Sequence, residues 1–88
     1  MPTKNTQKPE AIAADLQKLV GLNLRMHREK RSLTQEQLAH SAGMATRHLQ
    51  KIEAGRVNVT IRTIARLIHA LGLEPQALVA KQTGDQSR

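Results

Sequence analysis

The sequence has 88 residues, with no cysteine and no aromatic residue, and its formal net charge is +7 at pH 7. This length suits one small domain with an aliphatic core, for which tight packing or oligomerisation is expected. Disulfides and thiolate metal ligands are excluded, and no apolar run approaches the ~20 residues of a membrane span. We therefore expect a cytoplasmic protein with no membrane segment.

The positive charge is concentrated in the middle of the chain. Between Arg25 and Arg66 there are nine lysines and arginines but only three acidic residues. A basic surface of this kind suits a polyanion such as nucleic acid, although many ordinary protein surfaces are also basic.

The first predicted element is a helix over residues 10–31. Apolar residues recur there at helical spacing, and Pro9 suits a first helical turn. Gly21 is interpreted as a soft point inside this helix. Residues 1–9 are polar for the most part, and we expect them to form a flexible N-terminal arm.

The next two predicted helices form a helix-turn-helix. Thr34 and Gln37 have the spacing of a capping box, which predicts a helix over residues 35–42. Gly43 can adopt the positive φ that a tight turn needs, and Gly55 ends a helix over residues 46–54. Such a motif places its second helix in the DNA major groove. Its predicted crossing is apolar, with Leu38, Ala39, Ala42, Leu49 and Ile52, and Met44 is a plug beside it.

Two further helices complete an all-α fold. Thr60 is expected to cap a helix that ends at Gly72, and Pro75 opens a short fifth helix over residues 75–80. The domain is therefore predicted to span residues 10–80, followed by a flexible tail over residues 81–88. An apolar stripe is predicted along the fourth helix, formed by Ile61, Ile64, Leu67, Ile68 and Leu71.

The stretch from Leu24 to Leu78 resembles the XRE family, the phage repressor and Cro type of helix-turn-helix domain. The resemblance rests on LR…R at residues 24–28, LTQEQLA at 33–39, IEAG at 52–55 and ALGL at 70–73. It implies a lambda-repressor-like fold, a compact five-helix bundle that binds operator DNA, usually as a dimer.

Two positions depart from the family pattern. Ser32 stands where the family usually has glycine, so either Ser32 is strained or the turn differs. Ala45 stands where the family usually has serine or threonine. Either the third helix then lacks a side-chain cap, or Thr46 supplies it and is less available to bases.

The candidate base-contacting residues lie on the third helix, opposite Leu49 and Ile52. Arg47 can pair bidentately with guanine, and the other candidates can contact a thymine methyl or donate to guanine. The alternative is that all of them are solvated surface residues. The family resemblance points to the same positions, which are Thr46, Arg47, His48 and Lys51.

Contacts to DNA phosphates are expected at helix N-termini, where free backbone N–H groups attract anions. Such contacts position a domain without reading sequence. In the family, the residues matching Gln35 and Arg62 often approach the backbone. The full set of candidates is Thr34, Gln35, Arg56, Asn58, Thr60 and Arg62.

The resemblance also implies a buried ion pair between Arg28 and Glu53, with two exposed charges as the alternative. A dimer interface is expected from Leu73, Leu78 and Val79, or else from Ile12, Leu16 and Leu19. The alternative is that these residues complete the core of the monomer.

No enzyme is expected, because no histidine pair has metal-ligand spacing and no glycine-rich phosphate loop or carboxylate pair is evident. Neither a metal nor a cofactor is expected. The predicted function is a sequence-specific DNA-binding regulator of transcription, expected to be a homodimer on an inverted repeat. Two alternatives remain, namely the antitoxin that partners a toxin and a protein-binding adaptor.

Overall fold

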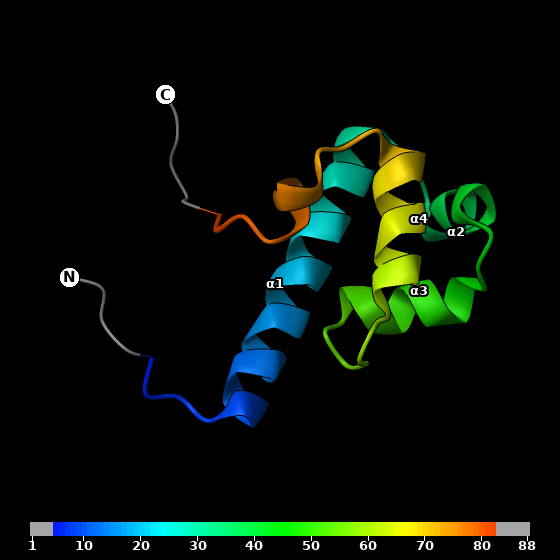
Figure 1. Cartoon of the computed structure of the whole chain (residues 1–88). Coiled ribbons are helices and arrows are strands. Elements are labelled where there is room, and N and C mark those ends of the chain that lie inside the picture. Colours follow the sequence, from blue (N-terminus) through cyan, green and yellow to red (C-terminus); the bar gives the residue numbers. More distant parts are fainter. Residues whose placement is uncertain (1–4, 83–88) are drawn as a thin grey trace.

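The computed structural model describes residues 5–82, which form four α-helices and one short 3-10 helix (Figure 1). The all-α prediction is confirmed. The predicted bounds of the first three helices lie within one residue of those observed. Most of the predicted arm and tail, residues 1–4 and 83–88, falls outside the described residues. The elements are α1 (Pro9–Lys30), α2 (Gln35–Ala42), α3 (Thr46–Glu53), α4 (Ile61–Leu71) and η1 (Pro75–Leu78).

The ends of α2 and α4 are set by the local signals that the sequence contains. The Thr34 hydroxyl accepts from the Gln37 amide at 3.0 Å, and the Gln37 side chain accepts from the Thr34 amide at 2.8 Å. The predicted capping box is therefore present. At the C-terminal ends, Gly43 and Gly72 adopt the left-handed conformation, with φ values of 69° and 65°.

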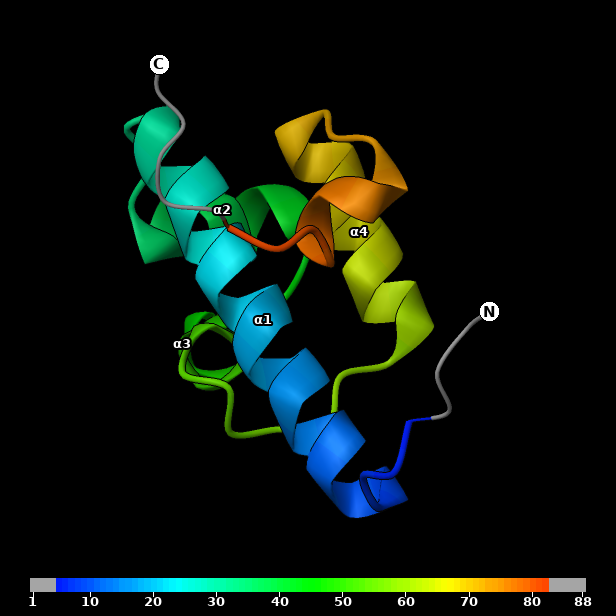
Figure 2. The ribbon, with the colours of Figure 1, turned by 90° about the vertical axis from the view of Figure 1, so that its left-hand side faces the viewer.

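The core lies where the helices meet. α1 packs on α3 and η1, and α4 packs on α2 and η1. Figure 2 shows α3 on one side of α1 and α4 with η1 on the other. Met44 packs against the core as expected. The apolar crossing predicted for the helix-turn-helix is confirmed, because all five of its members are buried: Leu38, Ala39, Ala42, Leu49 and Ile52.

The apolar stripe of α4 is only partly buried. Leu67 and Leu71 belong to the core, whereas Ile61 is largely exposed. Ile61 stands at the start of the predicted stripe and lines a groove that residues of α1 and η1 also line.

The predicted fifth helix is a single 3-10 turn. The reason is Asn23, a buried residue of α1 whose Nδ2 donates to the carbonyl oxygens of Leu78 at 3.0 Å and Ala80 at 2.8 Å. These carbonyl groups are therefore drawn onto α1 instead of continuing a helix.

This anchoring also corrects the expected dimer interface. Leu78 is 1% exposed and belongs to the core of the monomer, so it cannot meet a partner. Leu73 is half-buried against the same core, and only Val79 of the three predicted residues is well exposed.

Two backbone features of the turns and crossings stand out. Ser32 has a φ of 54°, so the first of the two alternatives holds and the residue is strained. Gly21 is more than a soft point. A Cβ atom there would lie 2.6 Å from the carbonyl oxygen of Ile52 and 2.7 Å from that of Glu53, so glycine is what lets α1 cross the end of α3 closely.

Across residues 5–82, none of the helices combines the length and the apolar character that crossing a membrane requires.

Candidate nucleic-acid interface

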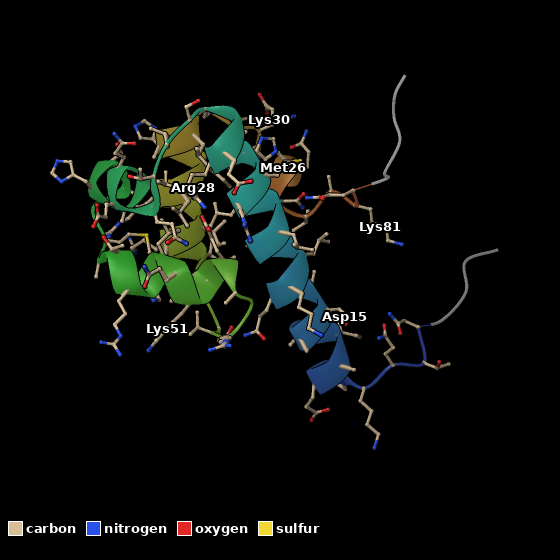
Figure 3. The ribbon with its side chains drawn as sticks, turned by 180° about the vertical axis from the view of Figure 1, so that it is seen from behind. Asp15, Met26, Arg28, Lys30, Lys51 and Lys81 are labelled. Atoms are coloured by element: carbon tan, nitrogen blue, oxygen red, sulfur yellow. The ribbon has the colours of Figure 1, made fainter. Side chains whose placement is uncertain are left out.

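One face of α3 is held by the core and the other is free. Leu49 and Ile52 are buried, while Arg47, Gln50 and Lys51 are exposed. Because an α-helix has 3.6 residues per turn, these three exposed positions share the side opposite the buried pair. Figure 3 shows Lys51 pointing away from the body of the molecule.

The start of α3 decides between the two roles considered for Thr46. The N-cap residue is Ala45, which has extended backbone angles and makes no side-chain capping hydrogen bond. Thr46 is the first residue inside the helix, so it does not act as the cap. It is half-buried, as is His48, and both lie at the edges of the exposed face of α3.

The predicted ion pair between Arg28 and Glu53 is present. Arg28 Nε donates to Glu53 Oε2 at 2.7 Å, and Arg28 Nη2 donates to Glu53 Oε1 at 3.0 Å. The two side chains are only 11% and 5% exposed, so the alternative of two exposed charges is wrong. The hydrogen bond with Glu53 raises the pKa of the Arg28 guanidinium above its ordinary value. This bidentate contact fixes the end of α3 to α1.

The same carboxylate also holds the start of α2. Gln35 Nε2 donates to Glu53 Oε1 at 3.0 Å, and Gln35 Oε1 accepts from Gln50 Nε2 at 3.4 Å. One side-chain N–H and the side-chain oxygen of Gln35 thus have protein partners, whereas its backbone N–H, at the first position of α2, has no partner within the helix. This link was not predicted from the sequence. Its only signal is a glutamine at the first position of α2 together with a glutamate at the end of α3.

The remaining phosphate candidates are two helix-capping threonines and three exposed side chains in or near the loop after α3. The hydroxyl groups of Thr34 and Thr60 are engaged in helix caps. The side chains of Arg56 and Arg62 are exposed, the first in the loop after α3 and the second in the first turn of α4. Figure 1 shows α3, that loop and the start of α4 at the same end of the molecule. Asn58 is exposed as well, but it lines an apolar groove beside α1.

The part of the chain that the structure describes contains no group of three or more histidine, cysteine, aspartate or glutamate residues placed to hold a metal ion. The arrangement instead offers one exposed helix face with cationic and amide side chains, joined to the protein by a buried ion pair. Such a face can enter a groove and present hydrogen-bond donors to base edges.

Comparisons with known proteins agree with this geometry. Residues 19–82 match the family model of a helix-turn-helix domain. The chain is 38% identical over 65 residues to the HTH-type transcriptional regulator y4dJ of Sinorhizobium fredii. The aligned region covers 74% of this chain and 84% of y4dJ. The chain is also 36% identical over 64 residues to the immunity repressor protein of Bacillus phage phi105. This aligned region covers 73% of this chain and 44% of that repressor.

One solved structure is similar to this chain over almost all of its own length. The restriction-modification controller protein C.AhdI from Aeromonas hydrophila superposes with a TM-score of 0.70 and 37% sequence identity. The similarity covers 74% of this chain and 97% of C.AhdI. The family match begins at residue 19, so the first turns of α1, residues 9–18, precede it.

Proposed function

Because the chain belongs to the XRE type of helix-turn-helix regulators, which bind DNA, we propose that it reads a specific operator as a homodimer on an inverted repeat. The observation that carries this proposal is the exposed face of α3, whose position is fixed by a buried ion pair. A regulator of this family is not an enzyme, and we place it in the cytoplasm, where bacterial and phage DNA is transcribed.

Arg47 is the principal candidate for base recognition. It is exposed on the first turn of α3, and residues at the start of a recognition helix reach furthest into the major groove. Its guanidinium suits the O6 and N7 atoms of guanine. Lys51 extends the same face, while Thr46 and His48 flank it.

Phosphate contacts are proposed on either side of α3. Gln35 contributes its backbone N–H, since its side chain is bonded to Glu53. Thr34 and Thr60 hold the starts of α2 and α4 in place, and the free backbone N–H groups of those first turns are proposed to bind phosphate. The exposed side chains proposed to reach the DNA backbone directly are Arg56 and Arg62, whereas Asn58, the other exposed candidate, lines the apolar groove beside α1 and is not assigned to DNA.

The homodimer is proposed because one recognition helix contacts too few base pairs to select one operator in a genome. A two-fold dimer doubles the site and places its half-sites one helical turn apart, roughly 34 Å. The regulator is favoured over the antitoxin and the adaptor, because the relatives reported above are named as a transcriptional regulator, a repressor and a controller.

The test begins by selecting bound sites from a pool of random-sequence duplexes. We expect Arg47→Ala to weaken binding to the selected site by ~1–3 kcal/mol and to relax preference at one or two base pairs. Arg62→Ala is the matched control. It should weaken binding to selected and random duplexes about equally and reduce the salt slope by about one unit.

The two variants distinguish the proposed roles. If Arg47→Ala weakened binding to selected and random duplexes equally, Arg47 would be a phosphate contact. If the pool yielded no enriched sequence, the chain would not be a sequence-specific regulator.

A further inference from the structure

An apolar groove lies between the N-terminal half of α1 and the start of α4. It is formed by the N-terminal half of α1, the loop before α4, the first turns of α4, and η1, and its volume is about 280 Å³. None of the described residues that line it is charged, and none comes from α2 or α3. A second hollow of about 660 Å³ adjoins it over α4, and the two share Ile61, Ile64, Pro75 and Val79.

Large exposed apolar side chains gather at this groove. Leu16, Ile61 and Val79 are 46%, 82% and 50% exposed, and all three line it. Among the described residues, the other large exposed apolar side chain is Leu22, which is 56% exposed and does not line the groove. Single exposed apolar residues are common, whereas a cluster beside a hollow marks an interaction surface.

One wall of the groove is held in place by a buried amide. Asn23 Nδ2 donates to the carbonyl oxygens of Leu78 and Ala80, the residues on either side of Val79. Gln82 Nε2 in turn donates to Asn23 Oδ1 at 2.9 Å. These bonds hold the backbone around Val79 against α1. The Val79 side chain is thereby kept at the groove.

We propose that this groove is the docking site for a second copy of the chain, and that residues 13–17 of α1 form one wall of it. This inference rests on the proposed function and deepens it by naming the surface through which the homodimer forms. Residues 13–17 lie before residue 19, where the family match begins. The two groups of apolar residues that the sequence offered as alternative interfaces are thereby joined, since Leu16 and Val79 line the same groove.

Three observations identify the occupant as a second copy. The parts of this sequence outside the described residues, MPTK and TGDQSR, are mostly polar and unsuited to an apolar groove. A chain of formal charge +7 repels its own copies, so two copies associate best through an uncharged face. The groove also has exposed apolar side chains next to hollows. In a two-fold dimer the same patch of both copies meets, so the side chains of one copy can fill the hollows of the other.

Docking here is compatible with DNA binding. Because α2 and α3 do not line the groove, the exposed face of α3 is not part of the proposed docking site. Figure 2 shows α3 and the α4–η1 pair on opposite sides of α1.

The first experiment is sedimentation equilibrium at micromolar concentration with Leu16→Lys and with the matched control Leu22→Lys. Both leucines lie on α1 and are about half exposed, but only Leu16 lines the groove. We expect Leu16→Lys to raise the dimer dissociation constant about tenfold or more and Leu22→Lys to leave it unchanged. Helical circular dichroism should show that both variants are folded.

A second experiment uses the absence of cysteine from the sequence. A single thiol introduced by Leu16→Cys or Val79→Cys should react with a maleimide more slowly as the protein concentration rises, whereas Leu22→Cys should react at a constant rate. Constant rates at all three positions, or protection only at Leu22→Cys, would overturn the proposed interface.

These outcomes are separable from the fate of the proposed function. A wild-type chain that stays monomeric but still binds the selected operator would overturn the groove and leave the regulator standing. A dimer that enriches no duplex would do the opposite.

Discussion

The two sides of α1 are built differently. On the side facing α3, Arg28 and Glu53 form a bidentate ion pair that is almost fully buried, and Gly21 lets the two helices come close. On the side facing α4 and η1, the N-terminal half of the same helix borders an open groove with exposed apolar side chains. We refer to these as the recognition side and the groove side.

The difference teaches where each kind of interaction is used. A buried ion pair with several hydrogen bonds contributes directional constraint, which suits a helix that must keep its orientation toward DNA. Apolar side chains at a groove are non-directional and gain stability only when something covers them. Damage to the recognition side should therefore reduce folding stability, whereas damage to the exposed groove residues should reduce association.

The largest effect is expected for Glu53→Ala. Removing the carboxylate leaves the buried Arg28 without its partner, and the free energy of unfolding should fall by ~3–5 kcal/mol. Urea unfolding followed by helical circular dichroism measures this change. The control is Glu29→Ala, which removes the exposed ion pair with Arg25 and should change stability by under ~0.5 kcal/mol. Equal losses of stability in the two variants would contradict the prediction that the buried pair contributes more than the exposed one.

A smaller loss of folding stability is expected for Asn23→Ala. This substitution removes the buried amide that holds the Leu78 and Ala80 carbonyl groups on the groove side. The Leu78 carbonyl loses this partner, so the free energy of unfolding should fall by about 1–3 kcal/mol. Because Val79 is no longer held, the dimer should also dissociate more readily in sedimentation experiments. Gln82→Ala keeps both bonds from Asn23 to the backbone carbonyls and is expected to have less effect on either measurement.

Gly21→Ala probes how closely α1 and α3 must approach. The added methyl group would meet two backbone oxygens of α3, so we expect destabilisation of about 1–3 kcal/mol in the same urea experiment. Alanine is a better helix former than glycine, which by itself would raise the free energy of unfolding by ~1 kcal/mol. A stabilised variant would show that the two helices can separate at no cost.

The smallest effect is expected for Ser32→Gly, in the turn that connects α1 to α2. Glycine adopts positive φ without strain, so stability should rise by about 0.5–1 kcal/mol in thermal unfolding. Ser41→Gly, inside α2, is the control and should lower stability through helix propensity. A loss of stability in Ser32→Gly would indicate that the serine makes a favourable interaction that outweighs its strain.

The success of sequence-based prediction differs between the same two sides. On the recognition side, the apolar crossing, the caps and the Arg28–Glu53 pair could be predicted, the last from the resemblance to a known family. On the groove side, Leu78 was expected at a dimer interface and is buried, and the predicted apolar stripe did not indicate that Ile61 is exposed. Both residues have the hydrophobicity of core residues, and nothing next to them in the chain indicates which neighbour covers them.

The sequence by itself determined the helices and their ends, because a capping box, a left-handed glycine and an apolar repeat act within a few residues of one another. Only the tertiary structure decided how Glu53 is shared between Arg28 and Gln35 and how Asn23 captures the backbone beside Val79. These contacts join residues 18 to 57 positions apart. Hydrogen bonds of this kind depend on where whole helices come to rest against one another, and no local pattern of side chains records that placement.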